Sequence, residues 1–151
     1  MSQYLLDILP IAARGYCCSQ ILAQLALGAQ GRENPDLVRA LGGLCHGMGQ
    51  CGMTCGVLTG GACVLNLYLG KGADCEAASE RADLAVSEFV DWFTQRTECF
   101  GGTACADILG ECADGKPDMS RCAEIIGDAW GQILAILVGQ GVDPTQAREC
   151  D

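Results

Sequence analysis

The chain has 151 residues, half of them apolar, and a formal net charge of −10 at pH 7. This length corresponds to about one domain that can bury a core without covalent staples, so we expect residues 1–151 to form a single domain. The acidic balance argues against nucleic acid, which needs a basic footprint, and against an anionic membrane surface.

The chain start does not resemble an export signal, because Asp7 and Pro10 lie within its apolar part and no basic residues precede it. This predicts a cytoplasmic protein, in which thiols are kept reduced. Twelve cysteines in 151 residues then favour metal binding or redox work over disulfides. The alternative is that about half of them are small buried hydrophobic residues.

Apolar spacing and helix-boundary residues predict helices in the first third of the chain. An amphipathic segment near the N-terminus is interrupted at Pro10 and ends near Gly15. A second helix runs from Cys18 or Ser19 to Leu27, with Cys17 at its entrance. Asn34 caps a third helix, which starts at Pro35 and includes Leu41.

The stretch 40–70 holds no Asp, Glu, Lys or Arg, but four cysteines, nine glycines and the only histidine, His46. We expect bends over 42–52 and a long buried helix from Cys51 or Met53 to Leu69. A membrane span is the alternative. His46 and Gln50 make the first half too polar for lipid, and the apolar part after it is too short, so no membrane insertion is predicted.

The second half continues with helices. One is capped by Asp74 and ends near Thr97, and a turn over 100–103 leads to a short helix over 104–109. A polar loop over 110–117 precedes a long helix that starts near Asp118 or Ser120 and reaches Val138. Asp143 opens a short tail helix. Because no β alternation is visible, the predicted fold is all-α, a compact bundle of four or five main helices around a buried central helix rich in glycine and cysteine.

Several familiar chemistries lack their motifs. No C-x-x-C or ferredoxin spacing occurs, and neither nucleotide-binding glycine motif is present. The carboxylates of Asp83, Glu88 and Asp91 fall on a solvated helix face, so acid–base catalysis has little support. His46, beside Cys45, could assist a thiolate or bind a metal, although a solvated loop histidine is commoner. The sequence does not decide whether the protein is an enzyme.

On the expected central helix, Cys51 and Cys55 share one face, and Gly52, Gly56 and Gly60 form a stripe at four-residue spacing. Such a stripe lets another helix or a planar cofactor approach the backbone closely.

Four sequence elements resemble one known family: G-Y-C-C-S-Q-I-L, then G-G-L-C-H-G-M-G-Q-C-G-M-T-C-G-V-L-T-G-G, C-A-D-I-L-G and R-C-A-E-I-I. They are similar to the bacterial redox-active proteins named for a C-GCAxxG-C-C cysteine pattern, over Gly15 to Val138. The resemblance implies a small helical redox protein, often encoded beside transporter or oxidoreductase genes, whose partner would be a redox protein or oxidoreductase. Its four family cysteines are Cys18, Cys55, Cys105 and Cys122.

This chain departs from the family pattern at two of the quoted positions. Cys17 stands where a polar residue is usual, and Val57 replaces an alanine. Helical spacing places Cys18 and Cys122 on the buried faces of their helices, so the family cysteines could converge inside the bundle.

Three functions are compatible with these patterns. The first is an iron–sulfur cluster held for electron transfer by Cys18, Cys55, Cys105 and Cys122, with Cys51 as a reserve ligand. The second is a cofactor-free dithiol/disulfide or thiol-transfer protein, using Cys105 with Cys122 or Cys51 with Cys55. The third is a structural module whose glycine stripe forms a homo-oligomer interface.

Overall fold

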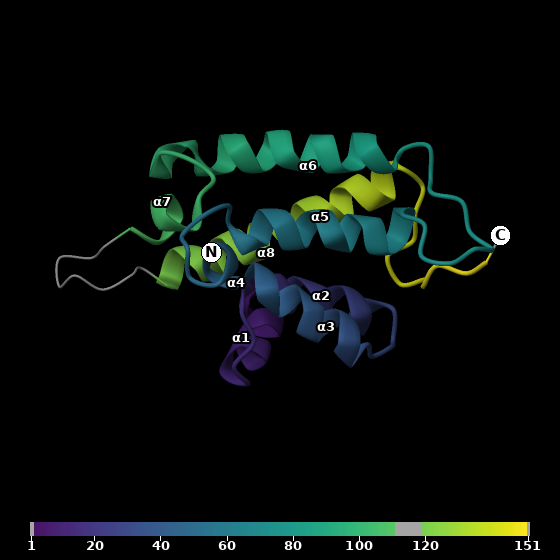
Figure 1. Cartoon of the computed structure of the whole chain (residues 1–151), viewed down its shortest axis with the longest axis horizontal. Coiled ribbons are helices and arrows are strands. Elements are labelled where there is room, and N and C mark those ends of the chain that lie inside the picture. The colour runs from purple at the N-terminus through teal and green to yellow at the C-terminus, as the bar shows by residue number, and fades with distance from the viewer. Residues whose placement is uncertain (1, 111–118, 151) are drawn as a thin grey trace.

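The computed structural model describes residues 2–110 and 119–150, and its regular elements are helices (Figure 1). Among these residues β structure is limited to one isolated antiparallel bridge between Thr54 and Ala104. The all-α prediction is therefore confirmed. Five helices have nine residues or more: α1 Leu5–Ala13, α2 Cys18–Ala29, α5 Gly56–Leu69, α6 Ala82–Thr97 and α8 Met119–Gly139. Three are shorter: α3 Pro35–Leu41, α4 Cys45–Met48 and α7 Cys105–Leu109.

Helix α5 is the centre of the bundle. It packs against α2 on one side and α6 on the other, and α8 crosses behind it (Figure 1). The predicted central helix is thus present and buried. Its Gly61 faces the ring of Phe89 on α6, so the absence of a side chain there lets the two helices approach closely. Phe89 and Phe93 of α6 and Ile133 of α8 are fully buried in the shared core.

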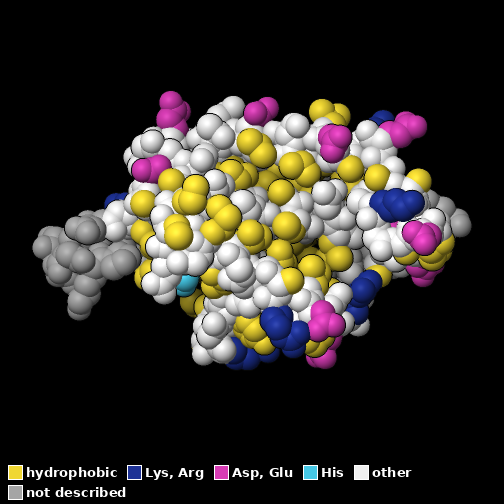
Figure 2. All heavy atoms as spheres, in the orientation of Figure 1, with side chains coloured by type: hydrophobic (Ala, Val, Ile, Leu, Met, Phe, Trp, Pro, Cys, Tyr) yellow, Lys and Arg dark blue, Asp and Glu magenta, His cyan; other side chains and the backbone are white. Residues whose placement is uncertain are grey.

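The two long edges of the molecule differ in charge. Figure 2 shows acidic side chains along the edge formed by α6, and basic side chains together with acidic ones along the opposite edge, near α2 and α3. Asp83, Glu88 and Asp91 of α6 are exposed, as the sequence predicts for a solvated face.

The start of α5 differs from the sequence prediction. The helix begins at Gly56, because the residues before it pair with another segment instead of coiling. The Cys55 N–H donates to the Thr103 carbonyl at 2.9 Å, and the Cys105 N–H donates to the Met53 carbonyl at 2.6 Å. The pairing partner lies fifty residues away in sequence, so local patterns could not reveal it. Cys51 and Cys55 therefore do not share a helix face.

Three other boundaries also differ. Helix α1 continues through Pro10. Proline has no backbone N–H, so the Leu6 carbonyl lacks its helical donor. Leu6 is strongly exposed to solvent, so water can reach this turn. Helix α6 begins at Ala82, not after Asp74, and the residues after Asp143 form turns where a tail helix was expected. The predicted loop over 110–117, apart from its first residue Gly110, and a helix start at Asp118 lie outside the described residues.

Among the helices that the structure describes, α8 alone is long and apolar enough to cross a membrane by itself. Its best window has a mean hydropathy of 1.4, but 44% of that window is buried inside the protein. Helices α1 and α2 pass the same test only as a pair, and they are bent by 118°. Because α8 packs its buried face on α5 and α6, a core helix accounts for its composition.

Candidate functional site

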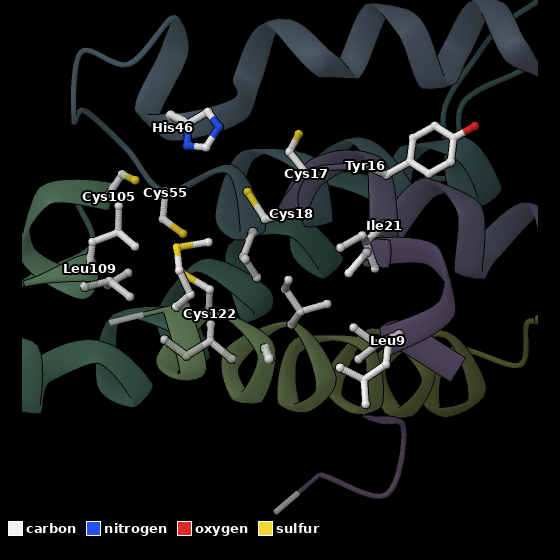
Figure 3. A pocket seen from close by; sticks show the side chains of 18 residues that line it. Leu9, Tyr16, Cys17, Cys18, Ile21, His46, Cys55, Cys105, Leu109 and Cys122 are labelled. Carbon is white, nitrogen blue, oxygen red and sulfur yellow. The ribbon is translucent and has the colours of Figure 1, made fainter. Parts of the chain in front are cut away.

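A cavity of about 340 Å³ lies among α1, α2, α5, α7 and α8. The four cysteines that the sequence singles out all line it: Cys18, Cys55, Cys105 and Cys122 (Figure 3). Most of the other lining side chains are apolar, among them Ile8 of α1 and Ile108 of α7. Among the described lining residues none is Asp, Glu, Lys or Arg. The described wall of the cavity is therefore apolar and uncharged, with thiols as its main reactive groups.

Each of the four cysteines lies at the start of a helix. Cys18 is the first residue of α2, Cys55 is the N-cap of α5, and Cys105 is the first residue of α7. Cys122 lies in the first turns of α8. Helix N-termini carry unpaired N–H groups and a partial positive charge, which favour a thiolate. The three long helices α2, α5 and α8 thus direct their positive ends to one cavity.

The bridge between Thr54 and Ala104 sets the relative position of two of the thiols. Cys55 and Cys105 each follow a bridge residue, and their N–H groups are held by the opposite strand segment. Two helices therefore begin side by side at this bridge, each with a cysteine at its first turn.

The glycine stripe receives helix α2 and the α7 segment of the same chain. A Cβ at Gly56 would lie 2.6 Å from the Cys18 sulfur, and one at Gly60 would lie 2.8 Å from the Ser19 Cα. Gly52, which has a φ of +68° and lies before α5, faces Ala106. The stripe is thus covered by α2 and the α7 segment of the same chain, and a homo-oligomer stays a prediction.

Burial favours the protonated form of Cys18, Cys55 and Cys105. It raises the pKa of Cys18 to about 11 and that of Cys55 to about 12, against an ordinary 9.0. Backbone N–H groups oppose the shift, but negative charge on neighbouring thiolates adds to it: Cys122 and Cys105 act on Cys18, and Cys18 and Cys105 act on Cys55. Burial also raises the pKa of Cys105. Cys18 is therefore near enough to Cys55, Cys105 and Cys122 for their charges to interact.

The reserve ligand is not at the cavity. Cys51 is exposed and is absent from the lining, because the chain turns away before the bridge. A redox pair of Cys51 with Cys55 is thus not supported. Cys105 and Cys122 both line the cavity, and their pairing stays a prediction.

Two disulfides are present where the sequence analysis expected reduced thiols. Cys17 is bonded to Cys45, with Cα atoms 6.0 Å apart, and Cys75 to Cys150, with Cα atoms 5.4 Å apart. Both spacings suit a disulfide. Sequence reasoning missed these pairs, since their members lie 28 and 75 residues apart. The one available signal was Cys17 at the helix entrance, where the structure confirms it as the N-cap of α2.

The short α4 is not a regular right-handed helix, because a left-handed turn follows Cys45 within it. Residues 46–50 all have φ between +57° and +67°, including His46, Met48 and Gln50. Left-handed backbone costs a non-glycine residue roughly 1–2 kcal/mol, and a run of it is rare. The turn places the exposed His46 at the edge of the cavity (Figure 3).

Comparison with known proteins identifies one family. The family model described as "Putative redox-active protein (C_GCAxxG_C_C)" matches residues 16–136. No curated protein and no solved structure matches the chain. The matched range includes all four cavity cysteines and four of the five helices that surround the cavity, with α8 included up to Ile136; α1 lies before it.

Proposed function

Because this chain belongs to the C_GCAxxG_C_C family of redox-active proteins, we propose that it carries an iron–sulfur cluster for electron transfer, held by Cys18, Cys55, Cys105 and Cys122. The observation that carries the proposal is the cavity, which four thiols from four helices line together. Four cysteine thiolates are the usual ligand set of two-iron and four-iron clusters. When bound, such a cluster supplies a centre that gains and loses one electron.

The donor set fits a soft metal. Cysteine sulfurs are the main metal-binding atoms among the described lining residues, and the lining His46 lies at the exposed edge. Carboxylates, which would favour magnesium or calcium, are absent from the described lining.

A cluster and a single metal ion differ in the spacing of their ligands. In the parts of the chain that the structure describes, no three of the His, Cys, Asp and Glu side chains lie close enough together to bind one metal ion. The ligand sulfurs of a cluster bind different iron atoms and are more widely spaced than the ligands of one zinc ion. Four thiols spread around one cavity are consistent with the wider spacing.

The raised thiol pKa values are compatible with this role. Without a cation, burial and mutual repulsion disfavour thiolates at Cys18 and Cys55. Bound metal deprotonates a coordinating thiol outright, and the converging helix N-termini stabilise the negative charge of the sulfurs. Cluster binding should therefore release protons.

The protein would also control the surroundings of the sulfurs. Ile8, Ile108 and Ile126 wall the cavity and are buried, so they exclude water. Backbone N–H groups of Val57 and Leu58 direct positive charge to the Cys55 sulfur. Hydrogen bonds to sulfur and low solvent exposure are two of the means by which a protein sets the potential of such a centre. The electron partner stays a prediction: a redox protein or oxidoreductase.

The test compares Cys55→Ser with Cys51→Ser after anaerobic reconstitution with iron and sulfide. Iron, acid-labile sulfide and the visible absorption spectrum are measured on protein that circular dichroism shows to be folded. We expect Cys51→Ser to bind a cluster like the unmodified chain and Cys55→Ser to lose or alter it. Colourless, iron-free protein from the unmodified chain, or equal loading of both variants, would contradict the proposal.

A further inference from the structure

A serine hydroxyl lies beside the Cys17–Cys45 disulfide, at nearly equal distances from both sulfurs. The Ser19 Oγ is 3.5 Å from the Cys17 Sγ and 3.4 Å from the Cys45 Sγ. It also donates to the Leu41 carbonyl at 2.8 Å. Ser19 is fully buried, Cys45 is buried, and Cys17 is half-buried and lines the cavity.

The hydrogen-bonding capacity of this hydroxyl matches the reduced form of the pair. A serine hydroxyl has one donor and two acceptor lone pairs, and the donor is committed to Leu41. In the disulfide neither sulfur carries a hydrogen, so the lone pairs of Ser19 have no donor from these sulfurs. In the dithiol, the S–H groups of Cys17 and Cys45 can both donate to them. The buried oxygen is therefore better satisfied when the pair is reduced.

Other contacts hold the two cysteines in place without the S–S bond. The Cys17 N–H donates to the Gln20 side-chain oxygen at 3.2 Å, and the Gln20 side-chain nitrogen donates to the Val38 carbonyl at 3.1 Å. With the bond from Ser19 to Leu41, these contacts join the start of α2 to α3. Reduction would therefore leave the sulfurs near each other and able to re-form the bond.

We propose that Cys17–Cys45 is a redox-active disulfide that exchanges with dithiols, a two-electron site beside the four-cysteine cavity. A thiolate of the dithiol attacks the Cys17 Sγ, because Cys17 is the accessible member and lines the cavity. The Cys17–Cys45 bond breaks, a mixed disulfide forms at Cys17, and Cys45 leaves with the electron pair and takes up a proton.

The second thiol of the dithiol completes the exchange. It loses its proton and attacks its own partner sulfur in the mixed disulfide, which releases Cys17 as a thiol. The protein disulfide has then gained two electrons and two protons, and the dithiol has become a disulfide. The start of α2 stabilises negative charge as it develops on Cys17.

The chain contains its own reference disulfide. Cys75 and Cys150 are both exposed and join the segment before α6 to the C-terminal tail, away from the cavity lining. A change at Ser19 should not affect their equilibrium.

The test uses iron-free protein equilibrated with reduced and oxidised dithiothreitol, then quenched with acid, alkylated and mapped by mass spectrometry. We expect Cys17–Cys45 to be reduced while circular dichroism shows a folded chain. We expect Ser19→Ala to lower the dithiol-to-disulfide ratio of Cys17–Cys45 by about two- to tenfold, which corresponds to the net contribution of one hydrogen bond. The ratio for Cys75–Cys150 should not change. The proposal would be overturned if Cys17–Cys45 were reduced only when the chain unfolds. It would also be overturned if Ser19→Ala left the dithiol-to-disulfide ratio of Cys17–Cys45 unchanged.

A second pair of variants identifies the attacked sulfur. With glutathione disulfide, Cys45→Ser should form a mixed disulfide at Cys17, and Cys17→Ser should form far less at the buried Cys45. The reverse order would show that Cys17 is not the point of entry. Neither measurement involves iron, so this proposal and the cluster proposal can fail separately.

Discussion

The Cα of Gly56 lies against the sulfur of Cys18, and a Cβ at Gly56 would come within 2.6 Å of that sulfur and 2.9 Å of the Leu44 carbonyl oxygen. The first residue of α5 thus has no room for a side chain, because α2 brings a cavity cysteine to its backbone. We predict that Gly56→Ala destabilises the protein by about 1–3 kcal/mol through overpacking and displaces Cys18. Urea unfolding would measure the first effect and iron content after reconstitution the second.

Gly28→Ala is the matched control. Gly28 lies in α2, and a Cβ there would meet nothing within 4 Å. The same substitution should stabilise the chain by up to about 1 kcal/mol, because alanine is the better helix former, and leave iron content unchanged. If Gly56→Ala behaved like Gly28→Ala, the close contact with Cys18 would carry no constraint.

The buried thiols predict how stability depends on pH. The pKa of Cys18 is raised to about 11 and that of Cys55 to about 12, from 9.0 in the unfolded chain. Between these values the unfolded state releases protons that the folded state keeps. The free energy of unfolding of the iron-free protein should therefore be fully retained below about pH 9 and fall above it, by at most about 1.4 kcal/mol per pH unit for each thiol.

Cys55→Ala tests the origin of that slope. Urea unfolding at about pH 8 and about pH 10.5 should show a smaller loss of stability in this variant than in the unmodified chain. Cys99→Ala, which removes an exposed thiol, is the control and should keep the full loss. An equal slope in all three proteins would assign the effect to other groups.

The sequence predicted the elements well where the signals are local. The buried faces of α2, α5 and α8 follow from apolar spacing, and Cys18 and Cys122 lie at the cavity as their spacing on these helices predicts. The family resemblance, confirmed over residues 16–136, supplied Cys55 and Cys105.

What could not be predicted depends on contacts between distant residues. The start of α5 is set by pairing with residues 103–106, and the Cys17–Cys45 bond needs α3 folded onto α2. The glycines of 42–52 indicated bends, but not that the non-glycine residues between them would also be left-handed.

The left-handed turn predicts an unusual gain from glycine. Gln50 is exposed and has a φ of +67°, so Gln50→Gly should relieve backbone strain and stabilise the protein by about 1 kcal/mol. The same change in a regular helix, Gln24→Gly in α2, should cost about 1 kcal/mol. Thermal or urea unfolding of the two variants would measure both. A loss of stability in both would contradict the left-handed backbone at Gln50.

The Cys75–Cys150 disulfide should stabilise the fold without serving the cavity. It closes a loop of 75 residues, and a crosslink of this length constrains the unfolded chain by up to about 4 kcal/mol. Part of the tail is also held by Arg148, which donates to the carbonyls of Tyr68 and Ala77 beside Glu76. We therefore predict that the double change of Cys75 and Cys150 to Ser lowers the free energy of unfolding by a few kcal/mol or less and leaves iron content unchanged. Urea unfolding and iron analysis on the same preparation would measure both, and a loss of iron from folded protein would place this disulfide in the cluster site after all.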